Sequence, residues 1–185
     1  MSLIVVSVLI SIGLAVLELS IKQVRLSTNA RDSEIAFHAA NAGMECARYW
    51  RRQSADEMEL GQAIDPNCFN SATRDTNTVS AVGGGDLSGD GEAFVYGYSF
   101  TWGVDNDRCT EVTTLVASSS LPGTGLDILN VTTYIPGYPG DSAGNDEKNC
   151  EPGARCTIMS VRGYNRPCGE IGNYGTVQRE VLLQF

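Results

Sequence analysis

The chain has only one histidine among its 185 residues, and only 19% of its residues are charged. Catalytic triads, Cys/His dyads and histidine-ligated metal sites all need an imidazole at a defined position. We therefore do not expect an enzyme. Basic residues are also few, 13 against 22 acidic ones, which gives a formal net charge of −9. Because the phosphate backbone repels such a chain, nucleic-acid binding is not expected either.

The rest of the composition is that of a folded chain, since 42% of the residues are hydrophobic. The length suits one ordinary domain and one long additional element. Residues 1–52 contain six basic and four acidic side chains, whereas residues 53–185 contain seven and eighteen. This uneven charge predicts two regions with different roles.

Residues 1–17 contain no charged side chain and form an almost continuous apolar run. As a helix this run would be about 25 Å long, near the short limit for crossing a bilayer. The alternatives are a cleaved secretory signal, which would have a basic residue before the apolar run, and a buried core helix. The side chains of this segment that are expected to be buried in a membrane or against neighbouring molecules are Leu3, Ile4, Val5, Val6, Val8, Leu9, Ile10, Ile12, Leu14, Val16 and Leu17.

The helical pattern continues beyond the apolar run. Residues 18–52 contain no proline and a single glycine, Gly43, so one amphipathic continuation is expected. The whole helix, residues 1–52, would then be about 75–80 Å long. A domain formed by residues 53–185 is too small to bury it, because it would be only about 30–35 Å across. Glu18 and Lys22, one turn apart, are expected to pair with each other or with a neighbouring molecule.

Residues 53–185 contain β-branched and aromatic runs that are separated by Gly, Pro, Asn and Asp. Such runs predict strands in an antiparallel sheet, and this sheet is expected to pack on the second half of the long helix. The expected fold class is therefore α+β, with a globular antiparallel head. The expected strands are residues 93–102, 109–117, 128–135, 156–162 and 176–185.

The head also contains most of the six cysteines, which are expected to form three disulfides in an oxidising compartment. Zinc is the competing interpretation, but no pair has C-x-x-C spacing and there is no second histidine. Six cysteines allow fifteen pairings. We favour Cys46–Cys68, which would join the helix to the following loop, with the other four pairing within the sheet region: Cys109, Cys150, Cys156 and Cys168.

This combination of an uncharged N-terminal helix, an amphipathic continuation and an oxidised antiparallel head resembles the type IV pilins and pilin-like proteins. The stretch Ala-Phe-His-Ala-Ala-Asn-Ala-Gly-Met-Glu at residues 36–45 is similar to a stretch in the first helix of several pilin-like families. The resemblance implies a pilin fold, cleavage of a leader by a prepilin peptidase, and a mature subunit beginning at Met1. It also implies insertion in the inner membrane before assembly.

The implied function is that of a structural subunit of an extracellular pilus, or fimbrium, a helical polymer for cell adhesion or motility. Its partners would be copies of itself and the pilus assembly machinery, with the apolar N-terminal helices bundled in the filament core. One alternative is a pseudopilin of a secretion or DNA-uptake machine. The other is a membrane-anchored extracytoplasmic binding domain that does not polymerise.

The chain departs from the pilin pattern at two positions. Val5 stands where most pilins have a glutamate, and Lys22 stands where many have a proline. Val5 points to a minor or unusual subunit. Gly13 is then the weakest helical position, and any stretching of the helix in a filament is expected between Ser11 and Ser20.

Two further sites are weaker candidates. Asp86, Ser88 and Asp90 have the spacing that begins an EF-hand calcium loop, but Gly97 replaces the acid expected at the twelfth position. A solvated loop is the preferred interpretation, so no cofactor is expected apart from this calcium candidate. Asn130 lies in the sequon Asn-Val-Thr and is a candidate for glycosylation if it faces outward.

Overall fold

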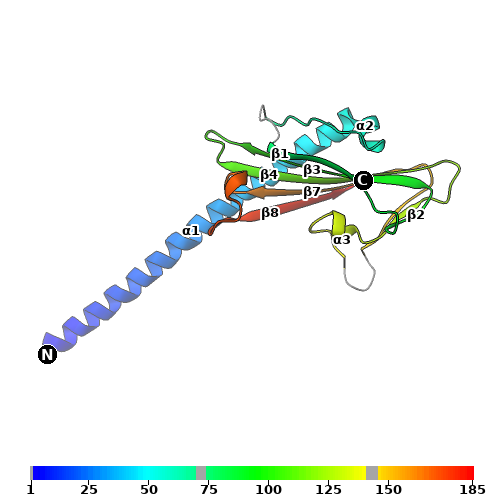
Figure 1. The fold of residues 1–185 in the computed structure, drawn as a ribbon. Coiled ribbons are helices and arrows are strands. Elements are labelled where there is room, and N and C mark those ends of the chain that lie inside the picture. The colour runs from blue at the N-terminus through cyan, green and yellow to red at the C-terminus, as the bar shows by residue number, and fades with distance from the viewer. Residues whose placement is uncertain (1, 70–73, 141–145) are drawn as a thin grey trace.

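One long helix and an antiparallel β head make up the computed structural model, which describes residues 2–69, 74–140 and 146–185, with the backbone alone for residues 2, 3 and 74–77. Helix α1 (Ser2–Gln53) runs for 52 residues without interruption, about 78 Å at 1.5 Å per residue. In Figure 1 its first half extends away from the sheet, with the N-terminus at the far end. The long helix and the antiparallel head expected from the sequence are both present, so the fold is α+β.

The head contains two antiparallel sheets. The larger has five strands in the order β1-β3-β4-β7-β8, and the smaller has three in the order β2-β5-β6. Helix α2 follows α1 directly, and α3 follows β5. The bounds are α2 Ala55–Glu59, β1 Arg74–Ala81, β2 Leu87–Gly89, β3 Gly91–Trp102, β4 Arg108–Ser119, β5 Leu126–Ile128, α3 Val131–Tyr134, β6 Lys148–Cys150, β7 Arg155–Tyr164, the short 3₁₀ helix η1 Cys168–Glu170, and β8 Gln178–Gln184.

The second half of α1 packs closely on one face of the large sheet. Its contact side consists mainly of small residues, and Ala36, Ala39 and Ala40 are fully buried. A Cβ atom at Gly163 of β7 would lie 2.2 Å from the Ala40 nitrogen and 2.3 Å from the Ala36 oxygen. Glycine at this position therefore lets the helix backbone touch the sheet backbone.

The opposite face of the large sheet is covered at one end by the small sheet and α3. A core of fully buried side chains forms between the two layers, including Leu115 and Ile158 from the large sheet. Leu126, Val131 and Ile135 reach this core from β5 and the α3 segment. The head therefore has apolar cores on both faces of the large sheet, one under α1 and one under the small sheet.

Four of the five expected strands are confirmed, as β3, β4, β7 and β8. The strand expected at residues 128–135 is wrong, because β5 ends at Ile128 and α3 covers Val131–Tyr134. Asn130 between them has the left-handed conformation with φ 53°. Asparagine adopts this conformation more readily than other non-glycine residues, and it ends the extended backbone.

Three disulfides join parts of the chain that the sheets alone do not connect. Cys46–Cys68 ties α1 to the loop after α2, the pair that the sequence favours. The other four cysteines pair within the sheet region, as Cys109–Cys168 and Cys150–Cys156. Cys109–Cys168 holds η1 against the start of β4.

Candidate assembly surface

The first half of α1 carries a large apolar surface that the head does not cover. Its large apolar side chains from Ile4 to Leu26 are all exposed, with exposed fractions between 47% and 72%. Fourteen side chains belong to this set: Ile4, Val5, Val6, Val8, Leu9, Ile10, Ile12, Leu14, Val16, Leu17, Leu19, Ile21, Val24 and Leu26. Their sequence positions place them all around the helix rather than along one stripe. The side chain of Leu3, which belongs to the same expected surface, lies outside the described residues.

The polar residues inside the apolar run leave the helix intact. The Ser7 hydroxyl donates to the Ile4 carbonyl at 2.8 Å, and the Ser11 hydroxyl donates to the Val8 carbonyl at 2.9 Å. Gly13 continues the helix, and a Cβ there would meet no other atom within 4 Å. Within the described chain, α1 is the one helix long and apolar enough to cross a membrane, by length and composition.

Beyond the uncharged run, the protruding helix mixes charged and apolar side chains. Glu18 and Lys22 are exposed, and no ion pair within the described residues joins them. Both are therefore free to contact another molecule, as the predicted inter-subunit pair requires. A hollow of about 550 Å³ lies where the helix leaves the head, lined by Val24, Arg25, Thr28, Asn29 and Tyr174.

Polar contacts anchor the helix at the end of the head from which it protrudes. Arg179 of β8 donates from Nε to the Ser33 hydroxyl at 2.8 Å. Further along, the Thr110 hydroxyl of β4 donates to the Ala39 carbonyl at 3.1 Å, and it accepts from the Trp102 indole at 3.0 Å. These contacts help fix the direction in which the protruding half leaves the head.

A buried ion-pair network anchors the other end of the helix. Arg51 donates to the Thr157 hydroxyl at 3.0 Å and to Glu59 at 2.9 Å. Glu59 also pairs with Arg155 at 3.0 Å, so its two carboxylate oxygens each face a guanidinium group. The Arg51 and Glu59 side chains are only 7% and 11% exposed. Such a pair is costly to break, because one charge would be left buried.

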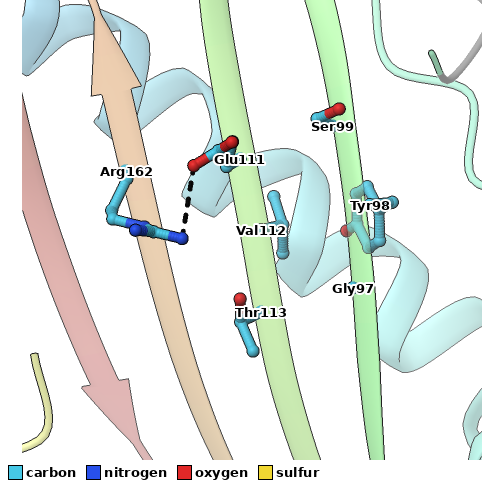
Figure 2. A pocket seen from close by; sticks show the side chains of 7 residues that line it. All are labelled: Gly97, Tyr98, Ser99, Glu111, Val112, Thr113 and Arg162. Carbon is cyan, nitrogen blue, oxygen red and sulfur yellow. Dashed lines mark ion pairs between the residues drawn. The ribbon is translucent and has the colours of Figure 1, made fainter. Parts of the chain in front are cut away.

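The uncovered part of the other sheet face is polar. A pocket of about 130 Å³ lies there, in which Arg162 of β7 pairs with Glu111 of β4 at 3.2 Å. Figure 2 shows how these two side chains point toward each other across the neighbouring strands. The Tyr164 hydroxyl donates to Glu111 at 2.7 Å. Burial, and then the hydrogen bond to Glu111, raise the pKa of Tyr164 above its ordinary value. Glu111 is therefore bonded to both Arg162 and Tyr164.

The calcium candidate, Asp86, Ser88 and Asp90, lies around β2, and its two carboxylates accept hydrogen bonds from other residues of the head. Asp86 accepts hydrogen bonds from Asn130 at 2.6 Å and from the Tyr134 hydroxyl at 2.5 Å. These bonds, Tyr134 first and then Asn130, lower the pKa of the Asp86 carboxyl. Ser88 is exposed, and one Asp90 oxygen accepts from the Thr124 backbone at 3.3 Å. In the described ranges no group of three or more His, Cys, Asp or Glu could hold a metal ion.

The sequon residue Asn130 is exposed, as glycosylation would require. It is the N-cap residue of α3 and does not lie in a strand, and its side-chain nitrogen donates a hydrogen bond to Asp86. A glycan on this nitrogen would have to replace that bond. Glycosylation of Asn130 stays a prediction.

The sequence did not indicate several of the residues that hold α1 on the sheet. The Arg51–Glu59 pair and the glycine contact at Gly163 arise from long-range packing, and their sequence neighbourhoods carry no motif. Comparison with family models, curated proteins and solved structures gives no match to this chain.

Proposed function

We propose that the chain is a structural subunit of an extracellular filament of the type IV pilus kind, assembled through the protruding half of α1. The observation that carries this proposal is the exposure of fourteen large apolar side chains on all sides of one helix. The head would then face the outside of the filament, where it is available for adhesion. Before assembly the same helix would lie in the membrane.

The hydrophobic free energy of burying these side chains favours a state in which another apolar surface always covers this helix. Each side chain is about half covered by the helix itself, so full burial would contribute about 10–20 kcal/mol in total for the set. This is comparable with the whole stability of an ordinary domain, about 5–15 kcal/mol. A chain that left the surface in water would aggregate. A bilayer or the helices of neighbouring copies must therefore cover it.

A specific feature favours neighbouring copies over a simple membrane anchor. A bilayer core accommodates about 20 helical residues. Val24 and Leu26 lie beyond that length and follow Lys22, yet they are 65% and 72% exposed. Outside a bilayer they would face water, whereas in a filament the adjacent helices or heads can cover them.

The test is electron microscopy of appendages sheared from the native cells, with mass spectrometry of the purified fibres. We expect thin fibres that contain this chain. A chain that stays in the membrane fraction, while no fibre contains it, would show an anchored monomer. Short oligomers confined to the membrane would instead indicate the pseudopilin function.

A paired variant separates assembly from membrane anchoring. Val24→Gln with Leu26→Gln removes the two apolar side chains that lie beyond the bilayer. We expect membrane insertion to be unchanged and the fibre yield to fall strongly, because neighbouring subunits would lose apolar contacts. Asn29→Gln is the matched control on the next turn. Equal fibre yield from the paired variant and the control would contradict the proposal.

A further inference from the structure

The turn between β3 and β4 displays an apolar side chain between acidic ones. Val104 is fully exposed at 101%, and Asp105 and Asp107 follow it within the turn. Gly103 and Asn106 both have positive φ, at 107° and 53°, so the turn has a defined and tight conformation. We refer to residues 103–107 as the acidic turn.

The charges in this turn are only partly matched within the chain. Asp107 lies 3.8 Å from Arg108, whereas Asp105 has no ion-pair partner among the residues that the structure describes. An exposed valine beside an unpaired carboxylate is not explained by the folding of the head. Both features suit contact with a surface that is apolar in its centre and basic at its rim.

Such a surface exists elsewhere on the head. A hollow of about 320 Å³ is lined by Arg48 and Arg52 of α1 and by Leu183 and Phe185 at the end of β8. We call these four residues the basic hollow. Leu183 and Phe185 provide apolar surface, and the backbone of Phe185 is fixed by two hydrogen bonds to Thr157.

The basic hollow also has an unmatched charge. Arg48 pairs with Glu45 at 3.2 Å. Arg52 is exposed and has no ion-pair partner in the described ranges. The unpaired charges of the hollow and the turn are thus opposite in sign, one guanidinium and one carboxylate.

The two surfaces lie at opposite ends of the large sheet and cannot meet within one chain. The acidic turn adjoins the end of the sheet where Cys109 of β4 lies opposite Tyr164 of β7. The basic hollow is at the other end, where the backbone of Phe185 is hydrogen-bonded to that of Thr157. Tyr164 lies seven positions after Thr157 along β7, which corresponds to about 23 Å at 3.3 Å per residue. In Figure 1 the C-terminus likewise lies at the end of the sheet away from the protruding helix.

We infer that the acidic turn of one copy docks in the basic hollow of a second copy, with Val104 against Leu183 and Phe185, and Asp105 beside Arg52. Two different patches at opposite ends of one subunit make a heterologous contact, which repeats along an open chain instead of closing a dimer. The apolar contact provides attraction, and the ion pair fixes orientation, because exposed ion pairs add little energy. The inference rests on the self-assembly proposed above.

Site-specific photo-crosslinking in the full chain, within native membranes and fibres, tests this contact. A benzophenone amino acid in place of Val104 should give a dimer whose crosslinked peptide contains residues of the basic hollow. The same probe in place of Leu121, another exposed apolar residue, is the control and should not label the hollow. Crosslinks from position 104 to any other surface, or no dimer at all, would overturn the inference.

A charge exchange provides a second readout. Asp105→Arg and Arg52→Glu should each reduce the crosslinked dimer at least twofold, and the two together should restore it. If the double variant is folded but its yield of crosslinked dimer does not recover, the docking would also be overturned. Electron microscopy of fibres from the same cells tests the proposed function separately. If fibres form but Val104 crosslinks to another surface, the filament proposal stands and only this contact is wrong.

Discussion

Replacing Gly163 with alanine should separate α1 from the sheet. The added Cβ would lie 2.2 Å from the Ala40 nitrogen, 2.3 Å from the Ala36 oxygen and 2.8 Å from the Ala39 carbonyl carbon. All three are backbone atoms of α1, so no side-chain rotation can relieve the overlap. The helix and the sheet would have to move apart, which would loosen the packing along the whole interface.

Overpacking a core costs about 1–3 kcal/mol, and a clash with backbone atoms belongs at the upper end of that range. We expect Gly163→Ala to lower the free energy of unfolding by about 3 kcal/mol, which for a chain of this size lowers the melting temperature by about 10 °C. Unfolding of the oxidised full chain in detergent can be followed by the fluorescence of its two tryptophans, Trp50 and Trp102.

Gly169→Ala is the control for this experiment, because a Cβ there would meet no atom within 4 Å. It should change the free energy of unfolding by no more than about 0.5 kcal/mol. If Gly163→Ala were equally neutral, the close approach of the helix to β7 would be wrong, and with it the fixed direction of the protruding helix.

Three further predictions concern the head. Arg51→Ala should cost about 3–5 kcal/mol in urea unfolding, because it leaves Glu59 buried with only one partner; a cost below about 1 kcal/mol would show that the pair is not buried. Burial raises the pKa of Tyr98 in the folded chain above its ordinary value. As the pH rises above about 10, this tyrosine ionises in the unfolded chain before it does in the folded one, so the free energy of unfolding should fall. Tyr98→Phe should flatten that decline, and an unchanged slope would contradict the burial. Replacing Cys109 and Cys168 by serine opens a loop of 59 residues and should cost about 4 kcal/mol, measured as a lower urea midpoint than in the oxidised parent.

The long elements could be predicted because their signals are local. Nothing between Glu18 and Arg52 ends a helix, and the structure continues it to Gln53. Strands β3, β4 and β7 are runs of β-branched and aromatic residues, each at least ten residues long. The exposed apolar surface follows from the same reasoning, because a helix of this length exceeds what the head can cover.

The remaining parts of the fold depend on contacts that sequence patterns do not contain. Strands β2 and β6 have three residues each, too few for a periodic pattern. Strand β1, Arg-Asp-Thr-Asn-Thr-Val-Ser-Ala, is polar because it lies at the edge of the sheet. The segment at residues 128–135 has the composition of a strand, but Asn130 and Tyr134 instead bond Asp86, and the chain turns into α3.

The stretch at residues 36–45, on which the predicted pilin resemblance rests, has a role within this chain. Its small residues Ala36, Ala39, Ala40 and Gly43 face the sheet, and a Cβ at Gly43 would lie 2.2 Å from the Thr110 methyl group. These positions therefore specify how the helix packs on its own head, and they say nothing directly about neighbours. Any protein that lays a helix this closely on a sheet needs small residues there. The argument for a filament consequently depends on the protruding apolar half of α1, and the variants that test it have to be made there.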